Sequence, residues 1–151
     1  DEEGYFAILD RKKDMIKRSG YSVFPAEVEE YLYKHEAVLE CAVIGVYDKL
    51  KGEMPLGFVV LNSGSSVNEE ELKKDLVMVV RKQVGPIATP RDIFVVPRLP
   101  KTRSGKILRG TIQKIADNKQ WNMPATIDDP VILDEMKVAL EGIGLGTARK
   151  E

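Results

Sequence analysis

Two apolar, β-branched runs separated by a polar connection constrain the fold of this chain more than any other feature. The first run, CAVIGVY, covers residues 41–47, and the second, LGFVVLN, covers residues 56–62. Runs of this length and composition are typical of β-strands. The sequence therefore predicts two neighbouring strands, joined by the polar segment DKLKGEMP.

Residues with helical spacing surround these strands. Helices are expected near 26–35, from a capping-box-like start at Asn68 to residue 84, and around 108–115, with a weaker helical pattern over 132–140. Shorter strands are expected at 5–9 and 92–97. This order favours an α/β or α+β fold in which a small sheet is covered by helices and carries its polar loops at one end.

Composition excludes several classes of function. A formal net charge of −1 in 151 residues argues against a general nucleic-acid coat. The single cysteine, Cys41, and the single histidine, His35, cannot form an intramolecular disulfide or a Cys/His zinc site. No run reaches the length of a membrane span and the first residues do not resemble a signal peptide, so a reducing, cytoplasmic location is expected.

Positive charge is concentrated in two segments. No acidic residue occurs from residue 93 to 116, and a ligand anion meeting this segment would find no neighbouring carboxylate to neutralise its cations. Basic residues also cluster just before Ser19-Gly20, where a glycine permits close backbone approach or a positive φ. The basic residues of the first segment are Arg98, Lys101, Arg103, Lys106, Arg109 and Lys114.

Two motifs resemble those of the adenylate-forming enzymes and match the smaller, C-terminal domain of that family. DRKKDMIKRSGYSVFPAEVEE resembles its hinge and glycine motif, and PKTRSGKILR, residues 100–109, resembles its catalytic-lysine motif. The resemblance covers nearly the whole chain and implies the mobile lid of an AMP-forming acyl-CoA synthetase. Such an enzyme joins a carboxylic acid to AMP from ATP, releases pyrophosphate, and then passes the acyl group to coenzyme A.

The resemblance implies a role for seven residues, each of which also has an ordinary surface or turn interpretation. Lys106 would be the catalytic residue that bridges the attacking carboxylate and the nucleotide in the first step. The others would be Arg11 at ATP or AMP, Lys13 at the hinge, Lys17 in the second conformation, Ser19 and Gly20 along the pantetheine tunnel, and Arg81 at the 3′-phosphate of coenzyme A. On composition alone, Arg81 is explained by its position at the end of a helix.

The same resemblance predicts how the chain is divided. Residues 1–10 would end the connection to a large domain, 11–120 would form the C-terminal domain, and 121–151 would wrap back as a tail that frays at its end. The chain starts without an initiating methionine and lacks a glycine- and serine/threonine-rich ATP loop, so we expect a fragment that is inactive alone. Its missing N-terminal domain would hold ATP with Mg²⁺ and the acid.

Two alternatives remain open at the level of sequence. One is the lid of a carrier-loading or luciferase-like adenylating enzyme. The other, from a different class, is a non-catalytic module that binds phosphate or another anion through the two cationic segments. The segments GPIATPRD and TIDDP resemble acetate and propionate enzymes and favour a short- or medium-chain acid, whereas Ser22 stands where acetate-type enzymes commonly carry an arginine.

Overall fold

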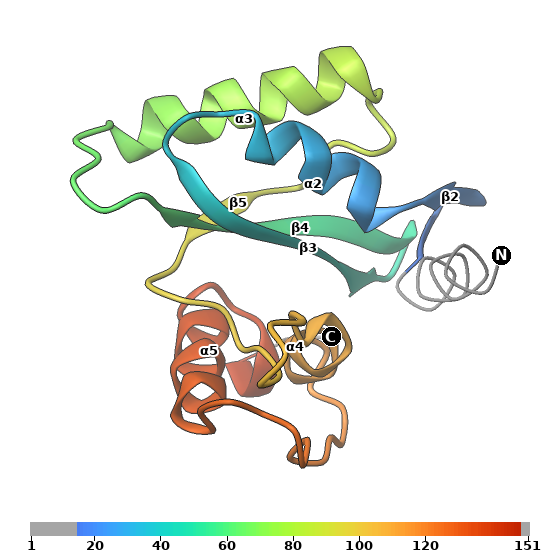
Figure 1. The fold of residues 1–151 in the computed structure, drawn as a ribbon. Helices are drawn as coiled ribbons and strands as arrows, with labels where there is room; N and C mark the ends of the chain where they lie inside the picture. Colours follow the sequence, from blue (N-terminus) through green and yellow to red (C-terminus); the bar gives the residue numbers. More distant parts are fainter. Residues whose placement is uncertain (1–14, 149–151) are drawn as a thin grey trace, which may run out of the picture.

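Two long antiparallel strands form the main part of the sheet in the computed structural model, which describes residues 15–148 (Figure 1). Strand β3 (Val38–Asp48) pairs with β4 (Gly52–Leu61) along almost its whole length, with Val43 opposite Gly57. The two neighbouring strands predicted from the apolar runs are confirmed, and each is longer than the run that indicated it.

Two short strands line the other edge of β4, and a third pairs with one of them. Strand β5 (Ile93–Val95) runs parallel to β4, while β1 (Ile16–Arg18) meets it at Gly52 and pairs with β2 (Tyr21–Val23). The resulting order, β2-β1-β4-β3 with β5 beside β4, leaves β3 as an edge strand. The sequence predicted a strand around β5 but not β1 or β2, and the strand predicted at 5–9 lies outside the described residues.

Helices cover both faces of the sheet, as the element order predicted. Helices α2 (Pro25–Tyr33) and α3 (Glu69–Gln83) pack on one face, and α4 (Arg109–Ala116) and α5 (Val131–Gly142) on the other (Figure 1). The side chain of Asn68 accepts a hydrogen bond from the backbone N–H of Glu71 at 3.1 Å and caps α3 as predicted. Within residues 15–148, no helix has the length and apolar character needed to cross a membrane.

The sheet separates two hydrophobic cores. On β3, Cys41 and Val43 face the core under α2 and α3, whereas Ala42 and Ile44 face the core under α4 and α5. Burial on both faces explains why this strand is a continuous apolar run. After α5, Leu145 is buried in the second core, just before the short 3₁₀ helix η1 (Gly146–Ala148).

Candidate functional site

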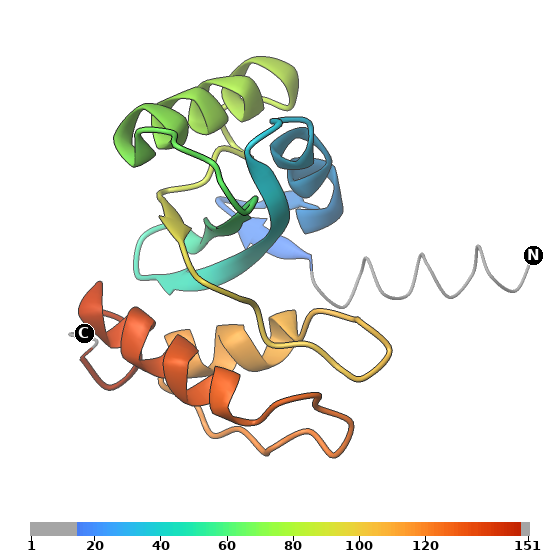
Figure 2. The same ribbon diagram turned by 60° about the vertical axis from the view of Figure 1, so that its left-hand side comes forward.

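The segment from Leu99 to Leu108, called here the lysine loop, is a closed turn between β5 and α4 that projects from the body of the domain (Figure 2). Thr102 organises it. Its N–H donates to the carbonyl of Lys106 at 2.8 Å, and its Oγ1 accepts from the Lys106 N–H at 3.1 Å and lies 2.9 Å from Ser104 Oγ. The turn closes at Gly105, whose φ of +92° favours glycine.

Contacts at its base hold the lysine loop to the rest of the domain. The N–H of Leu108 donates to the carbonyl of Pro100 at 3.0 Å, which brings the two ends of the loop together. The N–H of Arg103 donates to the carbonyl of Thr126 at 2.9 Å, so the loop also lies along the segment that leads into α5. The exposed Lys106 side chain is therefore carried by an ordered backbone.

Three cations of the basic segment are paired, which corrects the expectation of a field without neighbouring carboxylates. The acids come from distant parts of the chain, where a local reading of the sequence cannot find them. Hydrogen bonding to Arg98 lowers the pKa of the Glu135 carboxyl. The pairs are Arg98 with Glu135 and Asp129, Lys101 with Glu40, and Arg109 with Glu29.

Ser19 and Gly20 form the tip of a β-hairpin, residues 16–23, called here the glycine hairpin. Arg18 and Tyr21 are paired across the turn, and Ser19 and Gly20 have φ values of +51° and +83°. Two consecutive positive φ angles in a two-residue turn define the type I′ geometry that matches the twist of a hairpin. A Cβ on Gly20 would meet no atom of this domain within 4 Å, so its backbone conformation is what favours glycine there.

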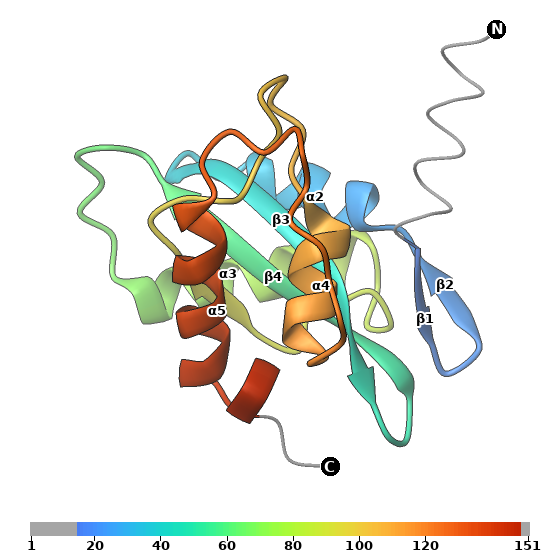
Figure 3. The same ribbon diagram turned by 90° about the horizontal axis from the view of Figure 1, so that it is seen from below.

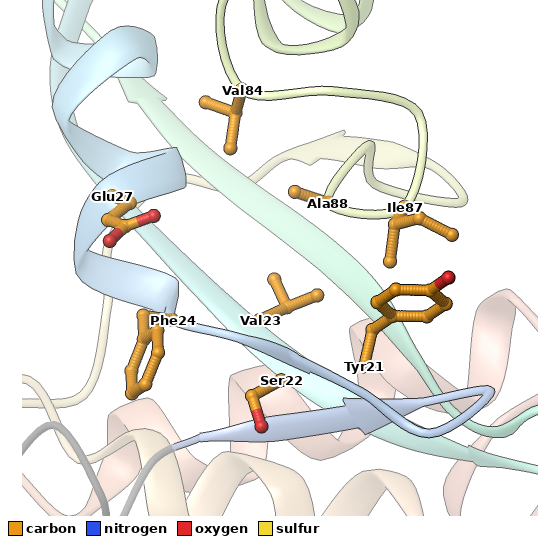
Figure 4. Close-up of a pocket in the computed structure, with 8 residues that line it drawn as sticks. All are labelled: Tyr21, Ser22, Val23, Phe24, Glu27, Val84, Ile87 and Ala88. Atoms are coloured by element: carbon orange, nitrogen blue, oxygen red, sulfur yellow. The ribbon is translucent and has the colours of Figure 1, made fainter.

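A shallow pocket of about 200 Å³ lies between the glycine hairpin and the segment that follows α3 (Figure 4). The guanidinium of Arg18 donates to the carbonyl of Ile87 at 2.8 Å and joins the two walls. Arg81 is exposed in the last turn of α3, shortly before Val84 in the pocket wall. The lining residues are Tyr21, Ser22, Val23, Phe24, Glu27, Val84, Ile87 and Ala88.

The lysine loop and the glycine hairpin project from different sides of the domain (Figure 3). The structure therefore places Ser19, Gly20 and the exposed Lys17 together, and does not bring them to Lys106. Arg11 and Lys13 lie outside the described residues. Among residues 15–148, no group of three or more His, Cys, Asp or Glu side chains is arranged to hold a metal ion.

Glu29 is the functional candidate that the sequence reasoning missed. In the sequence it is one of three acids within residues 27–30, yet in the structure it is only 5% exposed and is bound by Arg109. Burial also raises the pKa of the neighbouring Cys41 thiol, with a further contribution from the charge of Glu29, so this thiol stays protonated and unreactive at neutral pH. The only sequence signal for Glu29 was its place on the same helix face as Val28 and Leu32, the buried side of α2.

Comparison with known proteins assigns this chain to a family. Residues 27–106 match the AMP-binding enzyme C-terminal domain. The chain is 44% identical over 141 residues to the mitochondrial acyl-CoA synthetase short-chain family member B of Dictyostelium discoideum, a match that covers 93% of this chain and 20% of the relative. It is 42% identical over 149 residues to the acetyl-coenzyme A synthetase of Pyrobaculum aerophilum, covering 99% of this chain and 22% of the relative.

A solved structure agrees with the sequence relatives. The crystal structure of Brucella canis acyl-CoA synthetase is similar with a TM-score of 0.62 at 44% identity, over 67% of this chain and 18% of that one. The chain thus spans about a fifth of the length of the curated relatives it matches. With its helix-flanked sheet, its ordered lysine loop and this family match over more than half its length, the chain belongs to the AMP-binding enzyme C-terminal domain family.

Proposed function

We propose that this chain is the C-terminal lid of an AMP-forming acyl-CoA synthetase, which converts a carboxylic acid, ATP and coenzyme A into acyl-CoA, AMP and pyrophosphate. The observation that carries the proposal is the match to the C-terminal domain family, which runs from α2 to Lys106. Relatives named acyl-CoA and acetyl-CoA synthetases support it. Because these relatives are about five times longer, an N-terminal domain that binds ATP, Mg²⁺ and the acid is the proposed partner.

In the first half-reaction, Lys106 places its ammonium between the attacking carboxylate and the α-phosphate of ATP. An acid oxygen forms a bond to phosphorus while the bond to pyrophosphate breaks, and the two reactants carry like charges that repel. A cation at this place both aligns them and stabilises the charge that develops during transfer. The hydrogen bonds between Thr102 and both backbone groups of Lys106 support this role, because they define where the Lys106 side chain begins.

In the second half-reaction, the glycine hairpin replaces the lysine loop at the active site. Ser19 and Gly20 line the path of the pantetheine thiol, and Lys17 assists this conformation. The separation of the hairpin from the lysine loop supports such an alternation, since one rotation of the domain presents one side and withdraws the other. Arg81 is proposed to bind the 3′-phosphate of coenzyme A, Arg11 to contact the nucleotide, and Lys13 to act as the hinge.

The proposal is tested by Lys106→Ala in the full-length enzyme. We expect acid-dependent exchange of pyrophosphate into ATP to fall about 10²–10³-fold, the range typical of a lost electrostatic contact to a transition state. Thioester formation from supplied acyl-adenylate is spared. Lys114→Ala, which removes an exposed lysine of the same basic segment, is the matched control and leaves both half-reactions intact. An equal loss in both half-reactions of Lys106→Ala would reject the assignment.

The substrate is a finer part of the proposal. A short- or medium-chain acid is proposed, and activity of the full-length enzyme across a series of acids tests this. Strict dependence of product formation on coenzyme A separates the proposal from a carrier-loading or luciferase-like relative.

The cytoplasmic location stays a prediction. Fractionation of cells with an antibody to this domain would test it.

A further inference from the structure

Glu29 is the only charged side chain that is buried among residues 15–148. Its Oε2 accepts hydrogen bonds from the N–H of Val43 at 2.9 Å and from Nε of Arg109 at 2.8 Å, while its Oε1 accepts from Nη2 of Arg109. Burying such a pair costs desolvation of both charges, and apolar replacements of similar volume are often as stable. The pair is therefore better explained by what it positions than by stability alone.

The two partners come from opposite sides of the sheet. Glu29 belongs to α2 and Arg109 begins α4, and these helices cover opposite faces (Figure 1). Between them lies β3, whose outer edge has no strand partner within residues 15–148. The Glu29 carboxylate occupies part of that edge by accepting the Val43 N–H, and the guanidinium reaches the same carboxylate from α4. The ion pair thus links the two helix layers around the edge of β3.

This link lies beside the lysine loop. Arg109 is three residues after Lys106 and directly follows the loop. At the other end of the loop, Lys101 forms an ion pair with Glu40, which is a residue of β3. The side chain of Glu29 is 6% exposed, whereas that of Glu40 is 24% exposed. One end of the loop is therefore attached directly to a β3 residue, and the end nearer to Lys106 reaches β3 through Glu29, the more deeply buried of the two acids.

We propose that Glu29 is a positioning residue for Lys106, acting through Arg109 to fix the end of the lysine loop on the edge of β3. The inference rests on the proposed role of Lys106 in adenylate formation. The fork of two parallel hydrogen bonds sets the orientation of Arg109 as well as its distance. Since small displacements of a reacting group are costly, loss of this fork lowers the rate of the first half-reaction and spares the second.

The test uses Glu29→Gln in the full-length enzyme, with Glu135→Gln as the matched control. Both substitutions remove a carboxylate that binds an arginine through two hydrogen bonds, but the side chain of Glu135 is 42% exposed and lies in α5. Per folded molecule, we expect Glu29→Gln to slow pyrophosphate exchange by about 10- to 100-fold, in line with the cost of a misplaced group. Its thioester formation from supplied acyl-adenylate stays within about twofold, a change worth under 1 kcal/mol. Glu135→Gln changes neither.

A double-substitution cycle gives a result that a merely structural role would not. If Glu29 acts through Lys106, then Glu29→Gln has no further effect on pyrophosphate exchange in a Lys106→Ala background. Additive losses, or equal losses in both half-reactions, would overturn the inference while the role of Lys106 stands. If Lys106→Ala itself leaves exchange intact, it is the proposed function that fails.

Arg109→Lys decides the matter if Glu29→Gln does not fold. Lysine keeps a positive charge beside Glu29 but cannot form the two-pronged fork. We expect the same selective loss in pyrophosphate exchange, about tenfold, as for the loss of one charge-assisted hydrogen bond. Full exchange activity in folded Arg109→Lys would contradict the inference, because orientation of Arg109 would then be irrelevant to Lys106.

Discussion

The lysine loop and the glycine hairpin both end in a tight turn containing a Ser-Gly pair, yet they are built differently. In the lysine loop, the hydroxyl and backbone of Thr102 bind Lys106 and Ser104, and only Gly105 has a positive φ. In the glycine hairpin, Ser19 and Gly20 both have positive φ, and the Ser19 N–H donates to the carbonyl of Lys51 at 2.8 Å. The first turn depends on a side chain and the second on backbone conformation.

This difference suits the two proposed tasks. A loop that places a charged group at the reacting atoms must fix the position of the backbone from which the long side chain extends. Hydrogen bonds to that backbone fix it. A turn that lines a path for a thiol must instead stay narrow, and a backbone conformation without side-chain bulk does so. Substitutions that change either a side-chain hydrogen bond or the backbone conformation can therefore test the difference between the two turns.

Among the substitutions that test this comparison, Gly20→Leu in the full-length enzyme is expected to have the largest effect. Bulk at the tip of the glycine hairpin should lower thioester formation from supplied acyl-adenylate by about 100-fold, as for a misplaced reactant, with pyrophosphate exchange spared. Gly64→Leu is a close control, because Gly64 has the same φ of +83° and equally open space around its Cβ position. A similar loss in Gly64→Leu would mean that backbone strain, not the position of Gly20, causes the effect.

A smaller effect is expected for Thr102→Val. The change removes the hydroxyl that binds the Lys106 N–H and Ser104, two hydrogen bonds worth about 1 kcal/mol each. We expect pyrophosphate exchange to fall about tenfold if most of that energy is lost in the transition state. Thr102→Ser keeps the hydroxyl and should retain the rate. If Val and Ser behave alike, the hydroxyl does not position Lys106.

Glycine-to-alanine substitutions test how backbone conformation contributes to the free energy of unfolding. Gly105→Ala should lower the free energy of unfolding by about 1 kcal/mol, because its φ of +92° is unfavourable for an L-residue. Gly110→Ala should raise it by about 0.5 kcal/mol, since Gly110 is helical and its Cβ position is open. Urea unfolding of both variants measures the two signs, and a gain in Gly105→Ala would contradict the strained turn.

The smallest effect is expected at the ion pair before the lysine loop. Because Arg98 lowers the pKa of the Glu135 carboxyl, the pair contributes stability above the ordinary pKa of that group and loses it as pH falls through the lowered value. The stability difference between the native chain and Glu135→Gln should therefore be small at pH 7 and vanish in acid. Urea midpoints across this range measure it. A stability difference that grows as the pH falls would contradict this prediction.

The sequence predicted the parts of the fold that depend on local patterns. The apolar runs of β3 and β4, the cap of α3 at Asn68 and the helix that begins at Arg109 all follow from spacing along the chain. The strands of the glycine hairpin were missed because IKR and YSV are only three residues long and carry little strand signal. The paired Ser19 and Gly20 were recognised as a motif, but not as a hairpin turn.

The site was predictable where the motifs are continuous and not where it depends on distant contacts. Lys106, Ser19 and Gly20 stand inside motifs, whereas Glu29 and Arg109 are 80 residues apart and meet only in the folded domain. The neutralised cations have the same explanation, because their partners lie on α2, β3 and α5 or just before α5. Charge counted in a window describes composition, while the field at a site depends on tertiary structure.

The left-handed turn at Gly20 also has a stereochemical consequence. A φ of +83° is a comfortable conformation for a residue of the opposite chirality, so D-alanine introduced at this position by chemical ligation would add a methyl group without distorting the hairpin. L-alanine adds the same volume with distortion. The mirror-image pair would thus separate two reasons for which this turn can require glycine, the room left for a passing thiol and the handedness of its own backbone.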